Sequence, residues 1–504
     1  MGVLDILLHS FSPVSLMVAL VFLLLIYLCS PFMFSQHKPE PPGPRPLPLL
    51  GNLLQLDAKR PDKTLLQFSK KYGSVFSVYI GSQKVVVLAG YKTVKEALVK
   101  YKEEFGERDP PRAIMDANLH HGITFGNGDS WREMRRFALM NLKDFGMGTK
   151  SCEDKIIEES HHIVQEFKKF NGEAFDLSQV ISYAVCNIIC SMIYGTRFQY
   201  DAPDFVYIIN QTARGIRLLG SPAVQLYSFF PWIGKLFCSA QKEISSIYAA
   251  NKSHHLKLLN RLKENLNPQM CSSIAEAFML HQQQLEISGV TNNHFHSTNL
   301  LVTIMNLFNA GTETTAATLR WGILFMAKYP KIQARVQEEL NRLIGGRQVQ
   351  VEDRQRLPFT NAVIHETQRL ANLVPLSLLH RTSQDVTFQG HFIKKGTTVI
   401  PLLTSVLYDE SEWEKPNSFH PAHFLDKHGT FLKRDALLPF SAGLRMCPGE
   451  SLARMELFLF FATLLQHFRF SPPPGVSEEE LDLTPQGGGA LHPFPHKLCA
   501  VSLM

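Results

Sequence analysis

A helical spacing of apolar residues covers more of this sequence than any other pattern. Most of residues 93–373 carry apolar side chains three to four positions apart, which is typical of helices with one buried face. Patterns typical of β-strands occur in three places only. They are residues 74–90, which predict a hairpin around a Gly-Ser turn, residues 385–402, and the C-terminal tail. We therefore expect a mainly α-helical protein with a small β-rich region.

Length and composition restrict the number of domains and the class of protein. The 504 residues suffice for one very large core or for two to three domains, and the absence of repeats or a second linker favours one large domain. The eight cysteines form no regular framework, so we expect mostly free thiols in a reducing compartment. A net charge of +6 argues against a dedicated nucleic-acid binder and allows a local basic face.

The N-terminus predicts a membrane anchor. No charged residue lies between Asp5 and Lys38, and residues 14–34 within that window are long enough to span a bilayer. A cleaved signal peptide is the alternative, but the apolar run is too long and lacks a small-x-small cleavage site. The basic residues follow the span, which places the body of the protein in the cytosol.

A proline-rich segment, PEPPGPRPLPLLGN, follows the predicted anchor. So many prolines exclude a helix or a sheet ladder, which leaves a stiff extended spacer or, alternatively, an SH3 ligand. We expect an anchor over residues 1–36, a hinge over residues 37–52 and a catalytic domain over residues 53–504.

One cysteine lies in an unusual setting, the segment PFSAGLRMCPGESLAR. Cys447 precedes a helical pattern, Pro448 suits the first position of that helix, and Gly443 permits a tight turn. The free N–H groups of a helix N-terminus stabilise a thiolate. With the apolar Phe440 and the cationic Arg445, a thiolate suits haem, although a lone cysteine before a helix is more often structural.

The full pattern Phe-x-x-Gly-x-Arg-x-Cys-x-Gly is far more specific, and FSAGLRMCPG resembles the haem-binding signature of the cytochrome P-450 monooxygenases. The motifs WREMR, AGTETT and ETQR precede it in the family's order, so the resemblance covers essentially the whole chain. It is strongest to the microsomal family-two type, which handles xenobiotics, fatty acids and steroids. The resemblance implies the cytochrome P-450 fold, a haem with Cys447 as axial ligand, and an endoplasmic reticulum location with the catalytic domain on the cytosolic face.

Residues 300–330 predict a long, nearly uncharged helix that contains AGTETT. Gly311 weakens the helix and the threonines can bond back to the preceding turn, so we expect a local groove. From the residues alone, Gly311 is a packing glycine and Glu313 a salt-bridged acid. The resemblance instead implies that this helix crosses the haem, with Thr314 and Glu313 delivering protons and Ala310 beside the oxygen site.

ETQR places Glu366 and Arg369 on one helix face, a signal that by itself does not differ from an exposed pair. The resemblance implies that the pair closes a buried structural network with the loop FHPAHF. The matching residue there is His423, where an arginine is common elsewhere in the family.

Several segments are expected to hold the haem propionates. Trp131 and Arg135, four apart on one helix face, both carry donors without acceptor character. The resemblance adds Arg108, His380 and Arg445. Without it, Trp131 is a core aromatic residue and His380 a satisfied loop histidine.

The sequence has no Gly-x-Gly-x-x-Gly fingerprint, P-loop or ferredoxin-like cysteine set, so a partner must supply electrons. The resemblance implies NADPH–cytochrome P-450 reductase, an acidic flavoprotein docking on the cysteine side, with cytochrome b5 as a further partner. Arg132, Arg136, Lys433 and Arg434 form either a basic docking face or an ordinary solvated surface.

The substrate pocket is predicted by position from six residues: Ile114, Ile123, Phe125, Leu376, Gly489 and Ala490. The glycine run around Gly489 either enlarges the pocket or only makes a turn. The aromatic segment of residues 227–237, which includes Phe229 and Trp232, either enters the bilayer or belongs to the core.

These patterns favour a monooxygenase that inserts one atom of O2 into a lipophilic small molecule and releases the other as water. A haem-thiolate isomerase or hydroperoxide-processing enzyme is a second possibility, and a non-catalytic membrane-anchored lipid binder a third. The pair of Thr314 and Glu313 argues against the second, and the sequence leaves the substrate open.

Overall fold

The structure is a computed structural model that describes residues 17–19, 21–22, 39–146, 148–230, 238–291, 293–487 and 489–503. Its helices are α3 (Pro61–Tyr72), α4 (Tyr91–Val99), α5 (Arg112–Asp116), α6 (Gly128–Asp144), α7 (Lys150–Lys168), α8 (Ser178–Tyr194), α9 (Pro203–Leu219), α10 (Pro222–Phe229), α11 (Cys238–Glu264), α12 (Ile274–Ile287), α13 (Ser297–Lys328), α14 (Pro330–Leu343), α15 (Pro358–Ala371), α16 (Leu403–Leu407) and α17 (Glu450–His467). Short 3₁₀ turns lie between them, among them η5 (Pro421–Phe424) and η6 (Gly443–Arg445).

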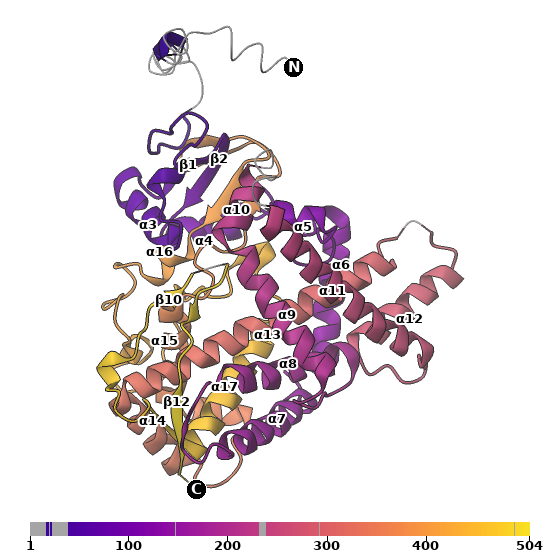
Figure 1. Cartoon of the computed structure of the whole chain (residues 1–504), viewed down its shortest axis with the longest axis vertical. Helices are drawn as coiled ribbons and strands as arrows, with labels where there is room; N and C mark the ends of the chain where they lie inside the picture. The colour runs from indigo at the N-terminus through magenta and orange to yellow at the C-terminus, as the bar shows by residue number, and fades with distance from the viewer. Residues whose placement is uncertain are drawn as a thin grey trace.

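The helices enclose one large apolar core with α13 at its centre, and α13 crosses the middle of the molecule in Figure 1. It packs against α8, α15 and α17, which are themselves buried over most of their length. Helix α8 is apolar on all sides, as expected for a helix surrounded by others. The prediction of a mainly α-helical fold is confirmed.

The strands form four small sheets. They are β1 (Val75–Ile80), β2 (Gln83–Leu88), β3 (Glu107–Arg108), β4 (Ala174–Phe175), β5 (His380–Arg381), β6 (Val386–Phe388), β7 (His391–Ile393), β8 (Thr398–Pro401), β9 (Phe468–Ser471), β10 (Pro485–Gln486), β11 (His492–Pro493) and β12 (Leu498–Ser502). The predicted hairpin is β1 and β2, and the strands expected in residues 385–402 are β6, β7 and β8.

The largest sheet has the order β1-β2-β8-β5-β3 and lies at one end of the molecule (Figure 1). Strand β8 pairs in parallel with β2, whereas β5 pairs antiparallel with both β8 and β3. The last pairing places Arg108 directly opposite His380. Two predicted site residues, far apart in sequence, therefore meet on neighbouring strands.

The proline-rich segment has no regular secondary structure from Pro39 to Pro46, turns at residues 48–50, and lies against the sheet. The Ser77 amide donates to the Pro42 carbonyl at 2.7 Å, and the Ser77 hydroxyl donates to the Pro41 carbonyl at 2.9 Å. Gly43 approaches so closely that a Cβ there would lie 1.9 Å from the Ser77 carbonyl oxygen. This part of the segment is docked on the catalytic body.

Within the described ranges, no helix combines the length and the apolar character needed to cross a bilayer. The predicted anchor lies outside the described residues apart from positions 17–19 and 21–22. In the aromatic segment, Tyr227 and Phe230 are buried and Phe229 is half-buried, while residues 231–237 lie outside the described part.

Candidate active site

The cysteine loop is a tight turn between η6 and α17. The Cys447 amide donates to the Phe440 carbonyl at 3.0 Å, which closes the loop on itself. Gly443 has φ +70°, and a Cβ there would lie 1.7 Å from the Leu98 carbonyl oxygen, so only glycine fits this position. The turn therefore fixes the place of the cysteine relative to α4.

The helix after the cysteine begins later than predicted. Its N-cap is Gly449 and its first residue Glu450, so Pro448 lies in the turn and not at the first helical position. A hydrogen bond from the Gly449 amide lowers the pKa of Cys447, but burial outweighs it and raises the pKa above its usual value. The surroundings alone thus favour the thiol, and a bound metal is needed to hold the thiolate.

Arg108, His380 and Arg445 form a buried cluster beside this loop. Arg108 donates to the Arg445 carbonyl at 3.4 Å, and the Arg445 Nε donates to the Gly106 carbonyl at 2.7 Å. Each of the three side chains retains one buried nitrogen without a hydrogen-bond partner: Nε of Arg108, Nε2 of His380 and Nη1 of Arg445. None of these nitrogens is satisfied within the part of the chain that the structure describes.

The electrostatics of the cluster favour the binding of an anion. Burial, followed by repulsion between like charges, lowers the pKa of Arg108 to about 9 and that of Arg445 to about 8. Burial and the two arginines also lower the pKa of His380 far below its usual value. Buried cations are stable only when paired, and a group with two carboxylates, such as haem, fits the two arginines directly and also fits His380, whose Nε2 becomes a donor once a carboxylate favours protonation of the ring.

Trp131 and Arg135 each donate a hydrogen bond to a backbone carbonyl near the cluster. The Trp131 indole N–H donates to the Ile123 carbonyl at 3.2 Å, and the Arg445 guanidinium lies 3.5 Å from the centre of the indole ring. Arg135 donates to the Met446 carbonyl at 2.5 Å. Trp131 thus supports the cluster through its ring face, and Arg135 ties α6 to the residue before the cysteine.

Asn127 is a member of the site that the sequence did not reveal. Its Oδ1 accepts from the Arg108 amide and from Arg445, both at 2.8 Å, and its Nδ2 donates to the Arg108 carbonyl at 3.0 Å. One side chain thus links both arginines.

Helix α13 runs unbroken through AGTETT, so the expected groove does not interrupt its backbone. A Cβ at Gly311 would lie 2.4 Å from Cδ1 of Ile189, which makes Gly311 a packing glycine against α8. Ala310 is exposed and Thr314 half-buried although most of the helix is buried. The Thr314 hydroxyl donates to the Ala310 carbonyl at 2.6 Å, so the two residues share this open face.

Glu313 points to a different region from Thr314. Its side chain is buried, and its Oε1 lies 3.4 Å from Nδ1 of His492 in β11. Burial raises the pKa of Glu313, while the positive charges of Arg320 and Arg217 oppose that rise. The acid is therefore a buried group that binds a proton more readily than an exposed glutamate does.

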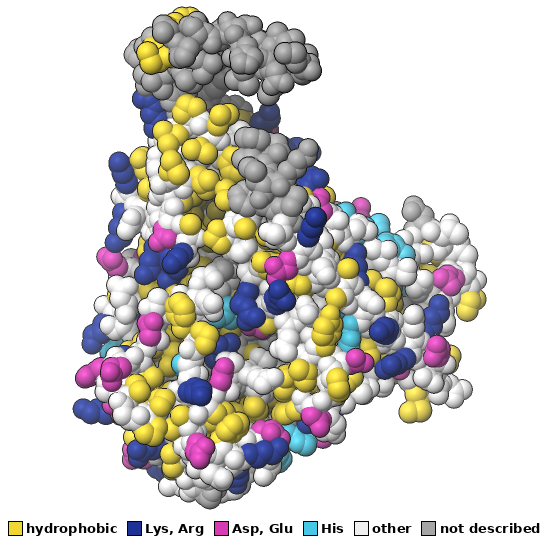
Figure 2. All heavy atoms as spheres, in the orientation of Figure 1, with side chains coloured by type: hydrophobic (Ala, Val, Ile, Leu, Met, Phe, Trp, Pro, Cys, Tyr) yellow, Lys and Arg dark blue, Asp and Glu magenta, His cyan; other side chains and the backbone are white. Residues whose placement is uncertain are grey.

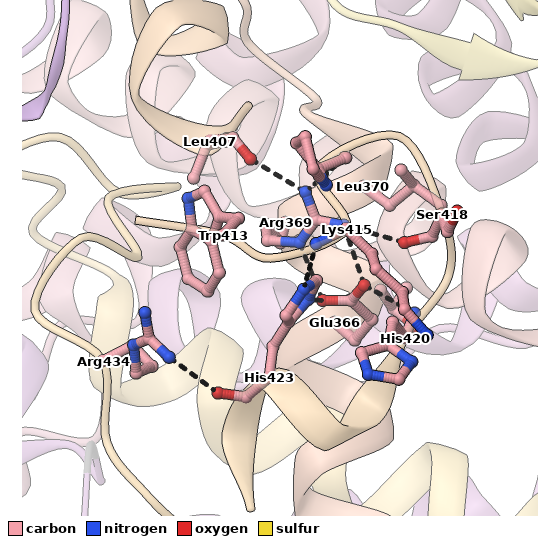
Figure 3. Close-up of polar contacts among 12 residues, drawn as sticks. Glu366, Arg369, Leu370, Leu407, Trp413, Lys415, Ser418, His420, His423 and Arg434 are labelled. Carbon is pink, nitrogen blue, oxygen red and sulfur yellow. Dashed lines mark hydrogen bonds and ion pairs between the residues drawn. The ribbon is translucent and has the colours of Figure 1, made fainter. Parts of the chain in front are cut away.

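Glu366, Arg369 and His423 form the buried network that the sequence predicted (Figure 3). Two hydrogen bonds of 2.8 Å join Arg369 to Glu366, and His423 Nδ1 lies 3.2 Å from the same carboxylate. Because His423 Nε2 accepts from the Lys415 amide, its Nδ1 carries the proton and donates to Glu366. Arg369 also donates to three backbone carbonyls, those of Leu407, Pro416 and Ser418.

The expected pocket residues come from three regions. Ile114 and Ile123 are buried and Phe125 is half-buried around the loop between α5 and α6, which Asn299 and Asn306 of α13 hold by hydrogen bonds. Leu376, half-buried, packs with the core of the largest sheet. Ala490 is buried, and the exposed Gly489 lies beside Gly220 at the end of α9.

The four candidate docking cations differ in their contacts. Arg132 pairs with Asp129 at 2.9 Å and with Glu103 at 3.6 Å. The Arg434 guanidinium lies 5.1 Å from the Trp413 ring centre and also donates to backbone carbonyls. Arg136 and Lys433 are exposed.

The chain matches known proteins over its full length. A family model described as Cytochrome P450 matches residues 41–500. "Cytochrome P450 2K1" of Oncorhynchus mykiss is 56% identical over 503 residues and covers 100% of both chains. "Cytochrome P450 2K6" of Danio rerio is 52% identical over 90% of each chain, and "Cytochrome P450 2C23" of Rattus norvegicus 42% identical over 92% of this chain and 93% of its own.

These matches confirm the resemblance carried by FSAGLRMCPG and the motifs before it. The chain therefore belongs to the cytochrome P450 family, in its microsomal family-two type, and is a haem-dependent monooxygenase.

Proposed function

We propose that this chain oxidises a lipophilic small molecule at a haem ligated by the Cys447 thiolate, with electrons from NADPH delivered by cytochrome P-450 reductase. The observation that supports the haem assignment is the buried cluster of Arg108, His380 and Arg445, each of which keeps a buried nitrogen without a partner among the described residues. A fatty acid, a steroid or a xenobiotic is the expected class of substrate.

The roles of the residues follow from their positions. Bound haem supplies the activation of O2 and the transfer of one oxygen atom to the substrate. Arg108, His380 and Arg445 hold its carboxylates by charge-assisted hydrogen bonds, with Trp131 and Arg135 supporting them. Ala310 leaves room beside the reacting face, Thr314 holds a proton at its hydroxyl, and Glu313 replaces that proton after its carboxyl turns from His492 toward Thr314.

The setting of the catalytic body is also part of the proposal. Residues 1–36 anchor it in the endoplasmic reticulum membrane, residues 37–52 form the spacer, and residues 53–504 form the catalytic domain on the cytosolic side. Leu47, Leu49, Leu50 and Leu54 are exposed, which suits a surface close to lipid. The reductase, with cytochrome b5 as a second partner, docks on the cysteine side.

Replacing the proposed ligand tests the assignment. Cys447→Ser removes the sulfur, so the reduced protein with carbon monoxide should lose the strongly red-shifted band of a thiolate-bound haem. Cys271→Ser changes an exposed thiol and should leave that band unchanged. A full-intensity band in the Cys447 variant would show that another residue ligates the iron.

A further inference from the structure

His492 is the partner that the structure gives to the buried acid of α13. Its Nδ1 lies 3.4 Å from Oε1 of Glu313, and both side chains are at least nine-tenths buried. Both ring nitrogens of His492 lack a hydrogen-bond partner among the described residues. A contact at this distance becomes a hydrogen bond after a small approach, as catalytic contacts do when substrate binds.

The backbone holds His492 in place beside α13. The residue opens β11, where it pairs with Gln486 of β10. On its N-terminal side, Leu491 accepts a hydrogen bond at 2.9 Å from the indole N–H of Trp321, and its amide donates to the Leu373 carbonyl at 2.8 Å. Because Trp321 and Glu313 lie on one helix, the strand and the acid are fixed to the same element.

The charges around this pair come from three elements. Arg217 in the last turn of α9 and Arg320 of α13 face both Glu313 and His492, and His496 lies beyond, near Arg320. Burial and the two arginines lower the pKa of His492 to about 4, so its ring is neutral at pH 7. Arg217 is exposed, so the charges that act on this pair extend to the protein surface.

We propose that His492 is a positioning residue that reloads Glu313 with protons during turnover. The step starts with a neutral ring that carries its proton on Nδ1. Nδ1 passes this proton to the Oε1 carboxylate of Glu313, and Nε2 takes a proton from a water molecule, which leaves to the solvent as hydroxide, so the ring stays neutral and only changes tautomer. Proton exchange with solvent restores the Nδ1 proton before the next turnover. The inference rests on the proposed proton-delivery roles of Glu313 and Thr314.

The test compares matched variants of the full-length protein in reductase-supported turnover. The probe is the compound with the highest wild-type turnover in a panel of fatty acids, steroids and drugs. His492→Gln keeps a polar N–H of similar reach but cannot relay a proton, and we expect about a three- to tenfold drop in product formed per NADPH consumed, with more peroxide released. The control is His496→Gln, the same change on the same segment, and it should leave this ratio unchanged.

A second measurement separates proton supply from a loss of structure. The product yield of His492→Gln should recover as the pH falls from 8 to 6, because water must then protonate Glu313 directly, whereas a packing defect gives a constant loss. The haem content and the probe's binding constant should match the wild type. A wild-type yield in His492→Gln at every pH would overturn the inference.

Glu313→Gln distinguishes this inference from the proposal it rests on. If Glu313→Gln uncouples NADPH use from product and His492→Gln does not, only the role of His492 fails. If neither variant uncouples turnover, the proton-delivery role of Glu313 itself fails.

Discussion

Two buried arginines have opposite surroundings in this protein. Arg369 is fully buried and satisfied, because Glu366 and three backbone carbonyls take its hydrogen bonds. Arg445 is also buried but contacts carbonyls, an asparagine and an aromatic ring; the charge of Glu107 acts on it, yet no acid of the described residues forms an ion pair with it. A buried charge without a counter-charge is costly, so the first arginine serves the fold, whereas the second requires a bound anion.

Glu456 is a second ionisable residue whose surroundings disfavour its charged form. It is buried in α17, where Thr315 hydrogen-bonds its carboxyl group but its Oε1 has no partner among the described residues. Burial raises its pKa from an ordinary 4.5 to about 8. The folded state therefore binds a proton that the unfolded chain releases above pH 4.5, and the stability from this group is lost as the pH rises through about 8.

Glu456→Gln should remove this pH dependence. Gln mimics the protonated acid, so the variant should gain stability relative to the wild type as the pH rises from 6 to 8, by on the order of 1–3 kcal/mol. The measurement is the thermal midpoint of both haem-loaded proteins across this range. A difference between the two midpoints that does not change with pH would contradict the shifted pKa.

At the scale of elements, α13 organises the site from several sides. One face carries Ala310 and Thr314, another brings Glu313 to β11, and the N-terminal part holds the loop before α6. In that loop the amides of Ile123 and Thr124 both donate to Oδ1 of Asn306, at 3.1 Å and 3.0 Å. One side chain therefore sets the position of a loop that carries expected pocket residues.

Asn306→Ala leaves these two amides without their acceptor. We expect a loss of about 1–3 kcal/mol in the stability of the loop, and weaker binding of a lipophilic probe. Hydrogen exchange of residues 119–127 in the haem-loaded protein measures the first effect, and spectral titration the second. Asn265→Ala is the control, because its lost bond joins the exposed Asn265, directly after α11, to the carbonyl of the exposed Arg261 in the last turn of that helix. Unchanged exchange in the Asn306 variant would show that other contacts hold the loop.

The sequence predicted those elements whose signal lies in contiguous residues. The Cys447 turn, the hairpin and the uncharged helix each have a local pattern, and the order of motifs supplied the Glu366 network. It did not predict Asn127 or His492, because their partners are distant in sequence. The role of Asn306 could have been predicted, because a polar residue in an apolar helix needs a hydrogen-bond partner when it is buried.

Charged side chains of both signs are dispersed over the molecule. Lysine and arginine outnumber aspartate and glutamate by 51 to 45, and charges of both signs are scattered over the face in Figure 2, where apolar side chains gather near the end that holds the largest sheet. Of the four candidate docking cations, Arg132, Arg136 and Lys433 are exposed, and Arg132 is already paired with two acids. A reductase contact would therefore depend on few charges.

Arg136→Glu tests this dependence. We expect the reductase concentration for half-maximal turnover to rise about three- to tenfold at low ionic strength, and the effect to shrink at high salt because salt screens exposed charges. Lys257→Glu makes the same change on the exposed face of α11 and is the control. The same response in both variants would point to net charge and not to a docking face.

The parallel pairing of β2 with β8 has a consequence for folding during the synthesis of the protein. Val85 leaves the ribosome long before Thr398, the residue it pairs with, has been translated. At roughly 5–20 residues per second, the first hairpin waits for on the order of tens of seconds with one edge unpaired. Chaperones that shield such an edge during translation should therefore decide how much of this chain reaches its native state.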